Sequence, residues 1–416
     1  MRLADVFELI VGGDAPVRFQ GFDGSVAGPA DAPVTVEIRS PRALSYLATS
    51  PGDVGLARAY IMGDLEVDGD LYTAMTSLRR RDLDLSWPVR LRAFRAMGGL
   101  KLLLRPPPRP GLEARLRGRR HSRARDAAAI AHHYDVSNRF YEWLLGPSMT
   151  YTCALYQTDS ATLEQAQAAK HELVCRKLGL RPGQRLLDVG CGWGGMVMHA
   201  ARHHRVRALG VTLSRRQAEW AQKAIAEAGL SQLAEVRHLD YRDVPAERFD
   251  AISSIGLTEH IGKKQLPDYF RFLYERLVPG GRLLNHCITR PDNHEPAARR
   301  RHFINRYIFP DGELESVGHL VSVMHDTGFE VRHEENLREH YARTLAAWSA
   351  NLEAHWDEAV AEVGLARART WRLYLVGSRI GFERNQIQLH QVLCSRPDDQ
   401  GRSHAPLRPD WEPPLP

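Results

Sequence analysis

The sequence lacks any apolar run that approaches the roughly eighteen residues a membrane-crossing helix requires. It also lacks the pattern of a secretory leader, because Asp5 and Glu8 interrupt the apolar residues near its beginning. It has only five cysteines, and none is arranged as Cys-x-x-Cys. An odd number of scattered cysteines argues against a disulfide framework and favours free thiols. We therefore expect a cytoplasmic protein.

Acidic residues are scarce between positions 79 and 125, where three of them accompany fifteen lysines and arginines. Such a stretch attracts an anionic surface. Within it, apolar residues recur at helical spacing from Leu91 to Leu104. This pattern suits a helix on the inner face of the cell membrane, and it equally suits a solvated helix packed on its own protein. Stacking aromatic residues are nearly absent, so no nucleic-acid partner is expected.

A glycine turn follows the apolar strand expected at 185–189 and precedes a helix that begins near Met196. Gly190, Gly192 and Gly194 can adopt positive φ and expose bare backbone to a ligand. The free N–H groups of the following helix favour a carboxylate or a phosphate. The spacing Gly-x-Gly-x-Gly, preceded by Asp188, differs from the Gly-x-Gly-x-x-Gly of dinucleotide folds. It is commoner where S-adenosylmethionine binds, although a plain strand-to-helix turn has the same pattern.

From about residue 127, strand-like and helix-like segments alternate, which is typical of a parallel doubly wound sheet. Strands are expected at 185–189, 206–212, 234–239, 249–254, 281–289 and 387–393, with a mostly helical insert from 291 to 383. The sequence thus predicts an α/β, Rossmann-like domain at 127–396. A small α+β domain at 1–80 and a basic, proline-rich linker at 81–126 precede it, and a polar tail at 397–416 follows.

Ligands of open α/β sheets bind beyond the carboxyl ends of the strands. The residues expected there are Gly190, Thr212, Asp240, Tyr241, Glu259 and His286. The second strand lacks the acid that usually binds ribose hydroxyls, so Thr212 and Gln217 would supply those hydrogen bonds. This lack also argues against a nicotinamide cofactor. No metal site is expected.

A series of ordered motifs resembles the cyclopropane-fatty-acid synthases and related S-adenosylmethionine-dependent lipid methyltransferases. The motifs lie at 133–138, 149–154, 188–194, 210–217, 240–243, 259–262 and 306–310, and around Tyr341. The resemblance covers nearly the whole chain. It implies a class I methyltransferase fold with a helical lipid-binding insert and a small N-terminal domain associated with lipid handling.

The resemblance also implies residue roles. The implied S-adenosylmethionine contacts are Tyr151, Asp188, Gly190, Gly192, Gly194, Thr212, Gln217, Asp240 and Tyr241. A bicarbonate ion would be held by Cys153, Glu259, His286, Tyr341 and the backbone at Ile288. Residues around Tyr307 and Phe309 would help to form an acyl channel. Taken singly, Cys153 fits a buried apolar position, Glu259 a helix cap and His286 a core histidine.

The implied activity is methylation of a double bond in an oleoyl-type phospholipid chain. The motif versions resemble the branch that makes 10-methylene chains, which a separate flavin- or nicotinamide-dependent reductase converts to 10-methyl (tuberculostearic-type) chains. Cyclopropane formation, a catalytically inactive lipid-binding scaffold, and methylation of a nucleic acid or small molecule stay open. A homo-oligomer is compatible with each interpretation.

Overall fold

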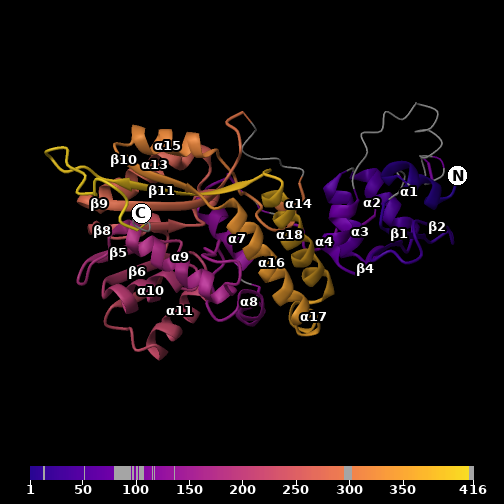
Figure 1. Ribbon diagram of the computed structural model, residues 1–416, viewed down its shortest axis with the longest axis horizontal. Helices are drawn as coiled ribbons and strands as arrows, with labels where there is room; N and C mark the ends of the chain where they lie inside the picture. The colour runs from indigo at the N-terminus through magenta and orange to yellow at the C-terminus, as the bar shows by residue number, and fades with distance from the viewer. Residues whose placement is uncertain are drawn as a thin grey trace. The chain divides into compact units, whose positions relative to one another are not determined.

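The computed structural model divides the chain into two compact units (Figure 1). It describes residues 1–12, 15–50, 52–78, 95, 98–99, 102, 107–114, 116, 118–134 (131–133 by backbone alone), 136–294 and 302–411. The first unit comprises residues 1–115, 300–308 and 356–380, and the second comprises 116–299, 309–355 and 381–416. Residues 300–308 and 356–380 therefore group with the N-terminal residues, whereas the sequence predicted a small N-terminal domain of residues 1–80 alone. Most of the amphipathic stretch between Leu91 and Leu104 lies outside the described residues.

The first unit is built around a four-stranded sheet of order β2-β1-β3-β4. Its strands are β1 (Arg18–Gly21), β2 (Val26–Ala27), β3 (Thr35–Ile38) and β4 (Leu65–Asp68). Its helices are α1 (Leu3–Val11), α2 (Pro41–Thr49), α3 (Asp53–Ile61), α4 (Leu71–Ser77), α14 (Phe303–Tyr307), α17 (Trp356–Val363) and most of α18 (Leu365–Glu383). Alternate residues of β3 are buried, as the period of a half-buried strand requires. Val376 and Ile380 of α18 join the same core.

A buried charged cluster joins three segments of this first unit. Arg58 on α3 donates from Nε to Glu113 Oε1 at 2.6 Å, and both side chains are less than 10% exposed. Tyr307 donates its hydroxyl to the same oxygen at 2.9 Å, and Arg306 reaches Oε2 at 3.3 Å. Burial alone would raise the pKa of Glu113, but the bonds from Arg58 and Tyr307 outweigh it and hold that pKa below its usual value. The sequence placed Tyr307 along an acyl channel, but its hydroxyl is hydrogen-bonded within this charged cluster.

The second unit contains a seven-stranded sheet of order β10-β11-β9-β8-β5-β6-β7. The strands are β5 (Arg185–Val189), β6 (Arg207–Thr212), β7 (Ala234–His238), β8 (Phe249–Ile255), β9 (Leu277–Thr289), β10 (Glu330–Asn336) and β11 (Gln388–Ser395). Strands β5 to β9 are parallel, and β11 runs antiparallel to β9. This arrangement confirms the predicted Rossmann-like α/β fold.

Helices cover both faces of this sheet (Figure 1). They are α7 (Arg123–Tyr134), α8 (Asn138–Leu145), α9 (Leu163–Leu178), α10 (Gly195–His204), α11 (Arg215–Glu227), α12 (Thr258–Ile261), α13 (Leu266–Arg276), α15 (Val317–Asp326) and α16 (Arg338–Ala354). Leu186 packs in the core under α9, α10 and α11, while its neighbour Leu187 packs in the core under α13 and α15. Because successive strand residues point to opposite faces, β5 is buried on both sides. No described helix has both the length and the apolar composition to cross a membrane.

Two expectations about strands need correction. Strand β9 begins at Leu277 rather than 281, because an irregularity in its pairing with β8 accommodates Pro279 and Gly280. Strand β10 lies within the segment expected to be mostly helical. It is an edge strand in which every residue is exposed or half-buried, so its sequence lacks an apolar alternation.

Replacing Glu113 by Gln should destabilise the first unit by about 3–5 kcal/mol, because the buried Arg58 guanidinium would lose its charged partner. Hydrogen exchange of the α3 amides measures this as a lower free energy of opening.

The matched control is Glu37→Gln. Glu37 pairs with Arg39 at the surface, where the two side chains are 39% and 48% exposed. Loss of such a pair should cost less than about 1 kcal/mol. Equal effects of the two substitutions would contradict the role assigned to the buried cluster.

Candidate active site

The glycine turn after β5 has the backbone that its sequence predicts. Gly190, Gly192 and Gly194 have φ values of 78°, 54° and 80°, which glycine adopts without steric cost. A Cβ on Gly190 would lie 3.1 Å from the Leu257 side chain, whereas a Cβ on Gly192 would meet nothing within 4 Å. The turn therefore packs tightly at Gly190 and exposes open backbone at Gly192, in front of the N-terminus of α10.

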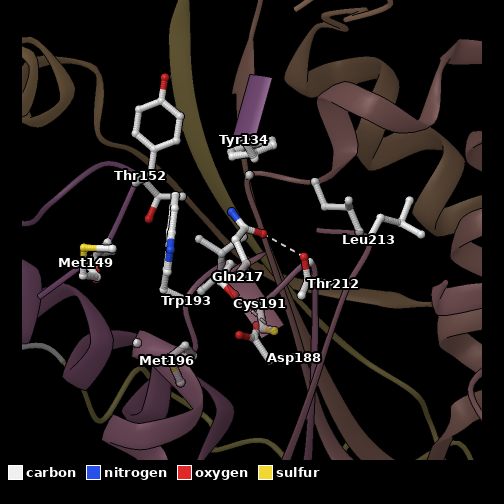
Figure 2. Close-up of a pocket in the computed structure, with 18 of the residues that line it drawn as sticks. Tyr134, Met149, Thr152, Asp188, Cys191, Trp193, Met196, Thr212, Leu213 and Gln217 are labelled. Atoms are coloured by element: carbon white, nitrogen blue, oxygen red, sulfur yellow. Dashed lines mark hydrogen bonds between the residues drawn. The ribbon is translucent and has the colours of Figure 1, made fainter. Parts of the chain in front are cut away.

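A pocket opens above this turn, with about 770 Å³ of empty space that is partly open to solvent. Figure 2 shows its floor around Asp188 and Cys191 and the Gln217 side chain above them. The predicted cofactor residues that line it are Tyr151, Asp188, Gly190, Gly192, Thr212 and Gln217.

Asp188 is an acid at the end of β5, with only 2% of its surface exposed. It accepts a hydrogen bond from Ser253 Oγ at 2.7 Å. Burial raises the pKa of Asp188 to about 6, opposed by the Ser253 bond and by the nearby ammonium of Lys170. At neutral pH the carboxylate is charged and can pair with a ligand ammonium, such as that of an amino acid.

Thr212 and Gln217 are joined, as the absence of an acid in β6 led us to expect them to act together. Thr212 donates its hydroxyl to Gln217 Oε1 at 2.8 Å (Figure 2). This bond fixes the side-chain amide with its oxygen toward Thr212. The Gln217 nitrogen, which donates only, is turned the other way. The pair thus offers a hydroxyl oxygen and an amide donor in place of the usual carboxylate.

Three predicted cofactor residues lie outside the described pocket lining: Gly194, Asp240 and Tyr241. Asp240 accepts two hydrogen bonds from the Arg242 guanidinium, at 2.8 and 2.6 Å. Tyr241 packs edge-on against Tyr269 and Phe272. Asp240 and Tyr241 thus lie in the turn that follows strand β7, and Gly194 is the N-cap residue of helix α10.

Aromatic rings form one wall of the pocket. Tyr134 lies edge-on to Tyr151, Trp193 and His260, with ring centroids 6.1, 6.4 and 6.4 Å away. Trp193 is held by a 3.0 Å hydrogen bond from its Nε1 to Asn138 Oδ1. Burial lowers the pKa of His260 to about 4, so its imidazole is neutral. Electron-rich faces near a ligand favour positive charge, including that of a sulfonium.

Glu259 is the residue before His260, which belongs to this aromatic wall. Its Oε1 accepts a hydrogen bond from the Ile288 backbone N–H at 2.7 Å. Burial raises the pKa of Glu259 to about 7, although the Ile288 bond opposes the shift. The Ile288 N–H, expected to contact a bound ion, is thus used to hold the carboxylate. This contact joins two of the predicted catalytic residues.

His286, Cys153 and Tyr341 are also buried beside pocket residues. His286 pairs across the sheet with the lining residue Ile255. Cys153 follows the lining residue Thr152, and burial raises its thiol pKa, so the thiol is protonated. Tyr341 packs edge-on against Trp348, which in turn packs on the lining residue Tyr151.

Two buried polar atoms in this group, Glu259 Oε2 and His286 Nε2, have no hydrogen-bond partner among the residues that the structure describes. Buried polar atoms normally have one, and leaving them unpaired is costly. The two atoms belong to residues on adjacent elements, since α12 follows β8 and His286 lies on the neighbouring strand β9. Each atom is therefore available to a polar ligand.

Several lining residues were not assigned a role from the sequence. Tyr134, Trp193 and His260 stand inside motifs that carried the resemblance, so those motifs could have identified them. Lys170 and His171 on α9 belong to no such motif. Lys170 is only 1% exposed, donates to Thr152 Oγ1 at 3.0 Å, and has a pKa that burial lowers to about 7.

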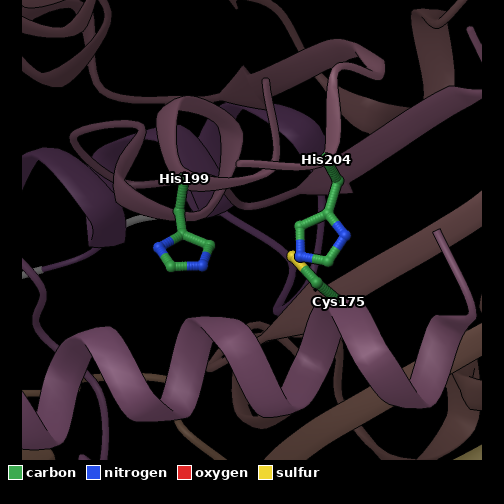
Figure 3. Close-up of side chains that lie close together, drawn as sticks. All are labelled: Cys175, His199 and His204. Atoms are coloured by element: carbon green, nitrogen blue, oxygen red, sulfur yellow. The ribbon is translucent and has the colours of Figure 1, made fainter. Parts of the chain in front are cut away.

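A separate cluster of metal-ligating groups lies between α9 and α10, although no metal site was expected. Ligand atoms of Cys175, His199 and His204 all lie within 4.8 Å of one another (Figure 3). Glu172 Oε2 lies 3.2 Å from His199 Nε2 and 3.0 Å from His204 Nε2. Because one carboxylate oxygen already pairs with both imidazoles, these two rings are satisfied without an ion.

Comparison with known proteins identifies the family of this chain. Residues 121–392 match the family model of mycolic acid cyclopropane synthetase. A probable fatty acid methyltransferase of Mycobacterium tuberculosis is 52% identical over 428 residues, covering 99% of either chain. A probable fatty acid methyltransferase of Pseudomonas putida is 36% identical over 401 residues, covering 94% of either chain. The solved mycolic acid cyclopropane synthase CmaA1, complexed with SAH and CTAB, is 34% identical with a TM-score of 0.61, covering 64% of this chain and 97% of its own.

The glycine turn, the pocket above it and these relatives all support the family that the sequence motifs resemble. The structural relative holds SAH, the product that S-adenosylmethionine leaves after methyl transfer, on the same fold. The chain is an S-adenosylmethionine-dependent methyltransferase and belongs to the mycolic acid cyclopropane synthetase family.

Proposed function

We propose that this enzyme transfers the S-adenosylmethionine methyl group to the double bond of an unsaturated, oleoyl-type phospholipid chain and forms a 10-methylene chain. The observation that carries the proposal is the pair of unpartnered buried atoms, Glu259 Oε2 and His286 Nε2. Methylation of a nucleophilic heteroatom requires little beyond cofactor binding and alignment. A buried carboxylate and imidazole behind an aromatic wall suit a reaction that passes through a cation and releases a proton.

Fatty acyl substrates are supported by the relatives, two of which are described as probable fatty acid methyltransferases. A phospholipid carrier is supported by the basic stretch at 79–125, whose charge suits an anionic membrane surface. We therefore place the enzyme at the inner face of the cell membrane.

The chemistry follows from the weak nucleophilicity of an alkene. Its π electrons form a bond to the sulfonium methyl carbon while the carbon–sulfur bond breaks, which leaves SAH and a cation on the acyl chain. Loss of one proton completes the reaction. The protein must therefore align the chain, exclude water that would trap the cation, and stabilise positive charge. Tyr134, Tyr151 and Trp193 can supply that stabilisation with their rings.

Bicarbonate fits the two unpartnered atoms. Glu259 Oε2 can accept its O–H, and an N–H at His286 Nε2 can donate to one of its oxygens. The Cys153 thiol and the Tyr341 hydroxyl are the further groups that the family resemblance assigns to the ion. When bound, bicarbonate would supply a negative charge to the site and an acceptor for the released proton.

Two products can arise from one cation. Loss of a methyl proton with ring closure gives a cyclopropane, whereas a preceding hydride shift leads to an exocyclic methylene. The preference for methylene comes from the motif versions at 253–262 and 284–289. A methylene chain would be the substrate of a separate flavin- or nicotinamide-dependent reductase. The ring product is the second candidate, and the family name favours it.

Incubation with methyl-¹³C S-adenosylmethionine and anionic vesicles of dioleoyl phosphatidylglycerol should place the label in the acyl chain. NMR of the isolated chain should show vinylidene signals, because the transferred carbon becomes a double-bonded CH₂. High-field ring signals would show the cyclopropane product instead. Cofactor binding without any acyl label would favour a non-catalytic scaffold, and label in nucleic acid or a small molecule would replace the lipid proposal.

Replacing Glu259 by Gln should lower turnover by roughly 100-fold or more, the range of a lost acid–base group, with S-adenosylmethionine affinity nearly unchanged. The amide retains the shape but cannot serve as an anionic acceptor. Turnover at saturating cofactor and calorimetric binding measure the two effects separately. Glu235→Gln, at a side chain 56% exposed on β7, is the matched control. Parallel losses of turnover and affinity would show that Glu259 serves cofactor binding.

Turnover at saturating cofactor should rise with pH through about 7, because burial holds the pKa of Glu259 near that value. Below this pH the carboxyl is neutral, and because Oε1 accepts from the Ile288 N–H, the proton lies on Oε2, which then loses its role as an anionic acceptor for a bound ion. Above this pH the carboxylate is charged. A pH profile of turnover, with cofactor affinity measured over the same range, checks this expectation. A flat turnover profile through neutrality would contradict the need for an ionised Glu259.

A further inference from the structure

A row of polar side chains extends from His286 away from the pocket. His286 on β9 is the cross-strand partner of Gln391 on β11, and Gln391 is the cross-strand partner of Glu335 on edge strand β10. Directly paired residues point to the same face of a sheet. Lys177 on α9 reaches this row with a side chain that is 0% exposed.

Hydrogen bonds connect the side chains of this row, and they determine which atom of each pair is the donor. Lys177 Nζ lies 2.8 Å from Gln391 Oε1 and also contacts Glu335 Oε2. An ammonium only donates, so the oxygen of the Gln391 amide must face Lys177. The Gln391 nitrogen then faces His286 Nδ1, at 3.2 Å. An amide NH₂ also only donates, and Nδ1 must therefore be the acceptor.

We propose that Lys177 and Gln391 are positioning residues that set the tautomer of His286, with the proton on Nε2. This inference deepens the proposed function and rests on it, since it assigns His286 its part at the ion site. A neutral imidazole whose Nδ1 accepts a hydrogen bond carries its proton on Nε2. That nitrogen is the atom without a hydrogen-bond partner in the described part of the chain.

The surroundings keep His286 neutral. Burial lowers its pKa well below the usual value, and the ammonium groups of Lys170 and Lys177 lower it further. The imidazole of His171, which interacts with His286, is neutral for the same reason, because burial and Lys170 lower its pKa. The Glu335 carboxylate is separated from His286 by the Gln391 side chain and pairs with Lys177.

The tautomer has a consequence for the reaction. His286 can donate from Nε2 to an anion in the site, but it cannot take up a proton there. The proton lost from the acyl chain must therefore go to another acceptor. Removal of the hydrogen-bond partner that fixes a metal-ligating histidine commonly lowers affinity or activity by about 10–100-fold, and we expect the same range here.

Gln391→Glu tests the inference with an isosteric change. The new carboxylate still accepts from Lys177, so the fold is kept, but it can only accept from His286. The imidazole proton should move to Nδ1, and Nε2 should lose its hydrogen. Turnover should fall roughly 10–100-fold with unchanged cofactor affinity. Gln391→Met, which removes the donor without adding charge, should give mixed tautomers and an intermediate turnover.

The tautomer is read directly by long-range ¹H–¹⁵N NMR of protein labelled at histidine, with His286→Gln to assign the signals. Gln388→Glu is the matched control on the same strand, where Gln388 bonds Asn385 instead; it should leave both tautomer and turnover as they are. Wild-type protein with the proton on Nδ1, or Gln391→Glu with full turnover, would overturn the proposal. Because the NMR readout needs no lipid, failure of the lipid assay in the wild type would count against the proposed substrate alone.

Discussion

The hydrogen bond from the Ile288 N–H to Glu259 fixes a buried carboxylate next to the pocket residue His260. A carboxylate without such a donor would be too costly to ionise at this depth. The bond forms because β8 and β9 are parallel neighbours, so that the turn after β8 returns α12 toward the end of β9. The same pairing puts His286 beside Ile255 at the pocket wall. The chemistry proposed here therefore depends on the register of two strands.

The fold was largely predictable because its signals are local. The apolar run at 185–189 is buried on both faces, and the glycines after it occupy positive φ, as the spacing predicts. Helix α2 begins after Ser40, whose hydroxyl accepts from the Arg42 N–H, which is a local capping signal. Strand β10 escaped prediction because an exposed edge strand needs no apolar alternation.

The site was predictable only where a residue stands in a motif. Glu259 follows β8, whereas His286 and Ile288 lie near the end of β9, and the rule for strand ends brings them together. Lys170, Lys177 and Gln391 gave no local signal. Their roles arise from packing α9 and β11 against β9, which are more than a hundred residues apart in sequence. Two fully buried lysines on one helix are unusual, and only the pairing across strands explains why Lys177 is tolerated there.

Helix α18 contributes to both units, so the first unit is not an independent accessory domain. Its residues to Ile380 belong to the first unit, where Arg369 donates to the Tyr60 carbonyl at 3.0 Å and pairs with Glu66. The last turn of the helix belongs to the second unit, where Phe382 packs on Tyr341 at 4.5 Å between ring centroids. Removing residues 1–80 would strip the partners from α18 and leave the buried Arg369 unpaired. Loss of activity on such a truncation would therefore reflect a damaged core, and point substitutions that keep this core are the means to separate lipid handling from stability.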